Sequence, residues 1–97
     1  MTESALQSWL LKELRKAGGW WIPTTGSVHM PRGTPDVVGC FTGSMYALEL
    51  KTEKGKVRNL QLWTLEEIEK HGGSSHLIRG RREAEVFLES LKKGETA

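Results

Sequence analysis

The spacing of apolar and polar residues divides the chain into three helical and four strand-like segments. Apolar residues repeat at helical spacing over residues 3–17, about 59–71 and about 82–91. Runs with strand character, bounded by turn residues, cover residues 20–24, 37–41, 45–51 and 75–79. The order helix, strand, strand, strand, helix, strand, helix predicts an α/β fold in which a mixed central sheet is flanked by helices.

The first helix begins close to an acidic residue whose place depends on the cap. Its core-facing residues repeat at i, i+4, i+8 and i+11, and are Leu6, Leu10, Leu14 and Ala17. Ser4 and Gln7 match a capping box, which would leave Glu3 outside the helix. With Thr2 as the cap instead, Glu3 lies in the first turn above the buried stripe. Glu3 then either complements the helix dipole or points at the acidic site described next.

The second and third strands are expected to form a hairpin, because residues 42–44, Thr-Gly-Ser, are a turn signal. The run 37–41 is apolar at both parities, which indicates a strand buried on both faces. Cys40, the only cysteine, is therefore expected to be a small buried thiol. In the alternating stretch that follows, Glu49 and Lys51 share one side, since strand side chains have a period of two.

One face of this hairpin would bring together Asp36, Glu49 and Lys51. Two carboxylates on neighbouring strands repel each other unless a cation lies between them. Their oxygens and a backbone carbonyl such as that of Leu50 suit a hard divalent ion, Mg²⁺ or Mn²⁺. No Cys/His cluster has the spacing of a zinc site. The alternative is that Glu49 and Lys51 merely pair on an exposed edge strand.

A divalent ion beside a lysine is suited to phosphodiester hydrolysis. The ion polarises a phosphoryl oxygen and lowers the pKa of a bound water. Lys51 would orient that water or offset the charge that develops on the phosphorane oxygens.

The helix after the hairpin carries a polar residue on its apolar face. Gln61 lies four and seven residues before Leu65 and Ile68, so it needs a polar partner. Asn59 is the expected N-cap. Leu60 and Trp63 form a flanking stripe that is expected in the core or in an interface.

The charge distribution favours a phosphate-bearing ligand, although the formal net charge is only +2. The basic residues form two clusters, Lys51, Lys54, Lys56 and Arg58, and Arg79, Arg81 and Arg82. Arg32, in the loop 25–34, lies four residues before Asp36 and could pair with it or meet a phosphate.

The length and the lack of long apolar runs restrict the class of protein. The 97 residues suit one domain, with residues 92–97 as a frayed tail. No apolar stretch approaches the ~20 residues that span a bilayer, and no secretory signal is visible. A cytoplasmic location is expected.

The adjacent Trp20 and Trp21 face opposite sides of a strand, so one covers a helix, a partner chain or a ligand.

Taken together, the motifs resemble a nuclease family. In order they are Glu3 with Gln7, Arg32-Gly33-x-Pro35-Asp36, Glu49-Leu50-Lys51, a loop containing Gly55, and Gln61. Their order and spacing, over residues 3 to about 91, resemble the VRR-NUC domain (virus-type replication-repair nuclease) of the PD-(D/E)XK superfamily. That domain is found alone in phages and bacteria, which implies the host cytoplasm as the location.

The resemblance implies a restriction-endonuclease-like core and a homodimer. It also implies that Asp36, Glu49 and the Leu50 carbonyl bind the metal and that Lys51 is the catalytic lysine. Glu3 and Gln61 would have supporting roles.

Three functions are compatible with these features. The first is a Mg²⁺- or Mn²⁺-dependent DNA endonuclease, for example one acting on four-way junctions or flaps. The second is a non-catalytic DNA-binding module with a nuclease-like core, and the third is an interaction protein that docks through exposed tryptophans. The expected DNA contacts are Arg32, Lys54, Lys56, Arg58 and Arg79.

Overall fold

The computed structural model describes residues 1–24 and 29–94, and within these ranges the predicted element order is confirmed. The elements are α1 (Glu3–Ala17), β1 (Trp20–Pro23), β2 (Val37–Phe41), β3 (Ser44–Lys51), α2 (Asn59–Lys70), β4 (Ser74–Arg79) and α3 (Gly80–Lys92). Part of the expected loop, residues 25–28, and the end of the expected tail, residues 95–97, lie outside the described residues.

The four strands form one mixed sheet in the order β1-β2-β3-β4. The pairs β1–β2 and β2–β3 are antiparallel, whereas β3 and β4 are parallel. The predicted hairpin joins β2 to β3 through Thr42 and Gly43, both of which have positive φ (46° and 85°). Two such residues match the twist of the flanking strands, so Phe41 pairs directly with Ser44.

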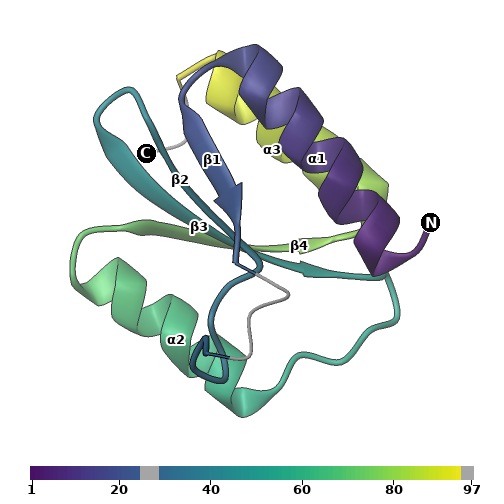
Figure 1. Ribbon diagram of the computed structural model, residues 1–97, viewed down its shortest axis with the longest axis vertical. Coiled ribbons are helices and arrows are strands. Elements are labelled where there is room, and N and C mark those ends of the chain that lie inside the picture. The colour runs from purple at the N-terminus through teal and green to yellow at the C-terminus, as the bar shows by residue number, and fades with distance from the viewer. Residues whose placement is uncertain (25–28, 95–97) are drawn as a thin grey trace.

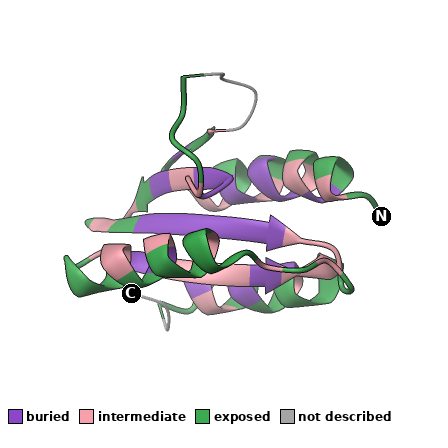
Figure 2. Ribbon diagram, turned by 90° about the horizontal axis from the view of Figure 1, so that it is seen from below, coloured by how far each residue is buried: buried purple, intermediate pink, exposed green. Residues whose placement is uncertain are grey.

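Helices cover the sheet on both faces, as Figure 1 shows. The helices α1 and α3 pack side by side on one face, and α2 packs on the other, over β3 and β4. The central strand β3 is therefore the most enclosed element, and residues 46–50 are all buried (Figure 2). No helix in the described ranges is long and apolar enough to cross a membrane.

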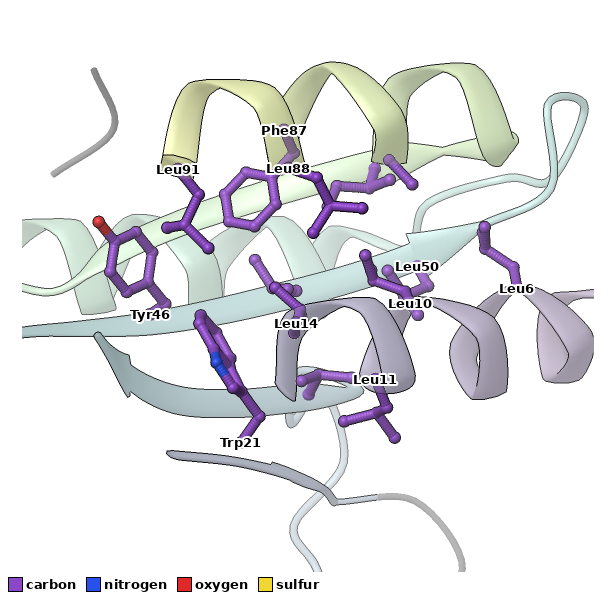
Figure 3. Close-up of a cluster of buried hydrophobic side chains, with 14 residues drawn as sticks. Leu6, Leu10, Leu11, Leu14, Trp21, Tyr46, Leu50, Phe87, Leu88 and Leu91 are labelled. Carbon is purple, nitrogen blue, oxygen red and sulfur yellow. The ribbon is translucent and has the colours of Figure 1, made fainter. Parts of the chain in front are cut away.

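The main core lies between the sheet and the helices α1 and α3 (Figure 3). It contains the predicted leucine stripe of α1 together with Trp21 and Tyr46, whose ring centroids are 5.7 Å apart. Phe87 of α3 meets Tyr46 edge to face, with centroids 6.2 Å apart. Trp21 is thus the core tryptophan of the adjacent pair, while Trp20 is 59% exposed.

The expectation that β2 is buried on both faces is wrong, and so is the expectation of a buried thiol. Residues Val37 and Gly39 face the main core, but Cys40 on the opposite side is exposed. The reason is the position of α2, which packs against β3 and β4 and leaves the outer face of β1 and β2 uncovered.

For α2, the expected N-cap is wrong, and one of the two alternatives for Leu60 and Trp63 is excluded. The N-cap is Arg58, and Asn59 is the first helical residue. Leu60 and Trp63 are 45% and 57% exposed, so they do not belong to the core of this chain. The residue that α2 does bury is Leu65, on the same face as Gln61.

Replacing Leu10, which is fully buried, should lower the free energy of unfolding strongly. We expect Leu10→Ala to cost about 3 kcal/mol, because it removes buried methyl groups and leaves a cavity. Leu62→Ala is the matched control, since Leu62 is 40% exposed, and should cost less than about 1 kcal/mol. Urea denaturation followed by circular dichroism measures both. Equal losses would show that the core is misassigned.

Candidate active site

Two buried carboxyl groups meet where β2 begins and β3 ends. Asp36 comes directly before β2 and is 9% exposed, and Glu49 lies in β3 and is 1% exposed. The backbone N–H of Leu50 donates a 2.8 Å hydrogen bond to Oδ2 of Asp36. Asp36 and Glu49 lie close enough for the charge of one to affect the ionisation of the other. The convergence predicted from the strand pattern is therefore present.

The backbone around Asp36 is held by Thr24, just past the end of β1. The N–H of Thr24 donates to the carbonyl oxygen of Asp36 at 2.9 Å, and its hydroxyl donates to the carbonyl of Pro35. No sequence pattern pointed to Thr24, because its role depends on the pairing of β1 with β2. These bonds fix the direction in which the Asp36 side chain leaves the strand.

Gln61 joins α2 to the acidic pair. Its Nε2 donates to Oε2 of Glu49 at 3.1 Å, and its Oε1 accepts from the N–H of Arg58 at 2.9 Å. The amide therefore caps the start of α2 and holds one oxygen of Glu49 at the same time. The polar partner that a glutamine on this face requires is thus found.

The pKa of Glu49 is raised from 4.5 to about 8, and burial is the largest cause. The neighbouring Asp36 and the negative charge of Glu3 contribute to the same rise, whereas the charge of Lys51 opposes it. With no cation bound, Glu49 is therefore mostly protonated at neutral pH. Its Oε1 is the one buried side-chain polar atom of the described residues that has no hydrogen-bond partner.

Glu3 and Lys51 lie at the margin of the acidic pair. Thr2 caps α1 by accepting from the N–H of Ala5 at 3.0 Å, so Glu3 lies in the first turn and Ser4 is not the cap. A cavity of about 290 Å³ is lined by Glu3, Ser4, Gln7 and Asp36. Glu3 thus reaches the site electrostatically as well as lying at the positive end of the helix dipole.

The alternative reading of Glu49 and Lys51 as an exposed pair is excluded. The strand β3 lies between β2 and β4, so it is not an edge strand. No ion pair joins Glu49 to Lys51 among the salt bridges of residues 1–24 and 29–94. The buried acid must therefore be explained by other partners.

The donor set of this site fits a hard divalent cation with water completing its coordination. No group of three or more His, Cys, Asp and Glu side chains in the described ranges is arranged to hold a metal ion. Asp36 and Glu49 provide two carboxylates, and Oε1 of Glu49 is buried without a partner. Mg²⁺ and Mn²⁺ characteristically bind to one or two carboxylates and keep several waters.

The basic residues expected to contact DNA lie in different surroundings. Lys54, Lys56 and Arg58 are exposed on residues 52–58, which connect β3 to α2, and Arg32 is exposed before β2. Arg79 is half-buried, and its guanidinium donates to the carbonyl oxygen of Gly55. Arg79 is therefore bonded within the protein, whereas the other four residues are exposed.

The chain shares its fold with a solved DNA-junction enzyme. The 1.6 Å structure of Hjc, a Holliday junction resolvase from the hyperthermophilic archaeon Archaeoglobus fulgidus, matches with a TM-score of 0.61 and 24% identity. The match covers 78% of this chain and 66% of the resolvase, slightly less than two thirds of its length. No family model and no curated protein matches the chain. The predicted restriction-endonuclease-like α/β fold is thereby confirmed.

The raised pKa of Glu49 predicts how stability depends on pH. The folded state is favoured when Glu49 is protonated. The stabilisation from protonated Glu49 is therefore complete below pH 4.5, the pKa of the unfolded state, and is lost as the pH rises through about 8. Between these two pH values, the free energy of unfolding of the wild type should fall by up to about 1.4 kcal/mol per pH unit relative to that of Glu49→Gln. Urea denaturation in EDTA at several pH values measures this difference.

The exposed Glu66 provides the control, and Glu66→Gln should follow wild type at every pH. A constant difference between wild type and Glu49→Gln would show that Glu49 ionises normally.

Proposed function

We propose that this protein is a metal-dependent DNA endonuclease that hydrolyses phosphodiester bonds. The observation that carries the proposal is Oε1 of Glu49, a buried carboxyl oxygen without a partner, beside Asp36. A carboxyl group left in this state is costly to bury unless the site receives a cation. Lys51 lies two residues beyond Glu49 on the same side of β3.

The proposed metal ligands are the carboxylates of Asp36 and Glu49 and the carbonyl oxygen of Leu50. The N–H of Leu50 bonds to Asp36, and the N–H and C=O of one strand residue point toward the same neighbour. The Leu50 carbonyl therefore faces the side on which Asp36 lies. A bound Mg²⁺ or Mn²⁺ would polarise the scissile phosphoryl group and lower the pKa of a coordinated water.

The other side chains of the site would adjust its charge and hold Glu49 in position. Glu49 has to lose its proton before it can bind a cation, so metal binding releases a proton. Gln61 keeps Oε2 of Glu49 oriented throughout. The Lys51 ammonium would offset negative charge on the phosphorane oxygens, and Glu3 would add to the negative potential that attracts the cation.

DNA is the proposed substrate, for example branched DNA such as four-way junctions or flaps. Lys54, Lys56, Arg58 and Arg32 are exposed and can neutralise phosphates. The fold shared with a Holliday junction resolvase supports a branched substrate, and the motifs support a VRR-NUC type of nuclease. A DNA-binding module without catalysis is the alternative, and it would be unaffected by EDTA.

A homodimer is proposed through the open sheet face, which consists of Trp20, Ile22, Cys40 and Met45. Trp20 pairs with Cys40 and Cys40 with Met45, so these side chains lie on one face of three adjacent strands. All four are exposed, and none is charged. A second copy of the chain related by a two-fold axis would cover this apolar face and would place two active sites on one substrate.

Mutation of the site should strongly reduce cleavage while leaving the fold intact. We expect Asp36→Asn, Glu49→Gln and Lys51→Ala each to reduce the rate about 10³-fold, roughly 4 kcal/mol of transition-state stabilisation. The assay is cleavage of plasmid, single-stranded, flap and four-way-junction DNA with and without Mn²⁺.

Two exposed residues of α2 provide matched controls, and Glu66→Gln and Lys70→Ala should cleave like wild type. Undiminished cleavage by Glu49→Gln would remove the proposed site. DNA binding that is insensitive to EDTA, without any cleavage, would instead favour the non-catalytic module.

A charge on the open sheet face should separate the dimer. Trp20→Glu is expected to weaken self-association at least about thirtyfold, because a large exposed aromatic ring is the type of residue that anchors an interface. Analytical ultracentrifugation measures the effect. Val86→Glu, on the exposed side of α3, is the control and should leave the dimer intact. A monomeric wild-type protein would refute the proposed interface.

A further inference from the structure

The segment 52–58 carries most of the exposed basic charge near the active site. It leaves the end of β3 directly after Lys51 and descends to the start of α2 (Figure 1). It contains Lys54, Lys56 and Arg58, all exposed, and belongs to no helix or strand. A segment of this kind has no regular backbone ladder to hold it, so its position depends on a few specific contacts.

One such contact comes from Arg79, 24 residues further along the chain. The Nη1 of Arg79 donates to the carbonyl oxygen of Gly55. Gly55 is the last residue of the turn 52–55, and its N–H closes the turn by donating to the carbonyl oxygen of Thr52 at 3.1 Å. Arg79 pairs in register with Lys51 on the neighbouring parallel strand, so its backbone is fixed beside the catalytic centre. The guanidinium therefore connects the rigid sheet to the turn.

A second contact strengthens the same junction. Gly80 has φ of +80°, and a Cβ at this position would lie 2.8 Å from Cγ of Glu53. The Glu53 side chain thus packs directly against the backbone where β4 turns into α3. That junction is itself fixed, because the N–H of Arg79 donates to Oε1 of Glu83 at 2.8 Å.

The far end of the segment is fixed by the active site itself. The N–H of Arg58 donates to Gln61, whose amide also binds Glu49. Residues 52–58 are therefore held at the turn by the β4–α3 junction and at their end by the catalytic acid. The exposed Lys54 lies within the turn, and the exposed Lys56 lies between the turn and Arg58.

We infer that Arg79 is a positioning residue, which holds the basic segment 52–58 in place so that Lys54 and Lys56 meet the DNA backbone in a preset arrangement. This inference rests on the proposed nuclease function, and it assigns Arg79 a different role from the direct phosphate contact expected from the sequence. A segment that is ordered before binding loses less conformational entropy on binding, so the advantage lies in substrate affinity.

Hydrogen exchange of the DNA-free protein tests the bracing directly. The Gly55 amide should exchange about tenfold faster in both Arg79→Gln and Arg79→Lys, since the shorter ammonium does not reproduce the guanidinium bond. Arg15→Gln is the matched control, because Arg15 also donates to a backbone carbonyl, that of Trp21 in β1, at 3.0 Å. It should leave Gly55 exchange unchanged.

Kinetics on a four-way junction then separate positioning from other roles. Both Arg79 variants should raise KM about tenfold and leave kcat within about twofold, whereas simple destabilisation would lower kcat and spare KM. Rescue of KM by lysine would show a direct phosphate contact and would overturn the inference. Unchanged Gly55 exchange in Arg79→Gln would overturn it as well. A wild-type protein that cleaves no DNA would refute the nuclease proposal, and the exchange measurement would still decide whether Arg79 braces the segment.

Discussion

The rest of the site depends on the burial of two neighbouring carboxyl groups, Asp36 and Glu49, at the end of the central strand. Their mutual repulsion and loss of hydration make ionisation of the pair unfavourable, and the protein responds by keeping a proton on Glu49. Gln61 and the Leu50 N–H each satisfy one carboxyl oxygen. Because Oε1 of Glu49 has no hydrogen-bond partner, the pair is suited to a divalent ion, which would offset the repulsion and supply the missing contact.

The fold was predictable where periodicity alone decides it. The stripe of leucines in α1 and the apolar face of α3 identified the main core, and the Thr42-Gly43 turn identified the hairpin. Exposure of Cys40 and of Trp63 was not predictable, because it depends on which half of the sheet α2 covers. A strand with apolar residues on both faces is expected to be covered on both faces. One of the two covers can be a partner chain instead of the chain's own core.

The site was predictable to the extent that the two-residue period of a strand determines it. Placing Glu49 and Lys51 on one side of β3, with Asp36 beside them, required only this period and the hairpin. Gln61 was found because a glutamine on an apolar helix face needs a partner. Thr24 and the bond from Arg79 to Gly55 were out of reach, since both join segments whose proximity follows from the pairing of strands distant in sequence.

The hydrogen bonds of Thr24 to Pro35 and Asp36 tie together the two ends of the excursion between β1 and β2. Chain inserted or deleted between such tied ends costs little free energy, because loop-closure entropy grows only with the logarithm of loop length. The length and composition of this excursion could therefore change without displacing Asp36. Chains that differ in this excursion could then keep the same buried carboxyl pair.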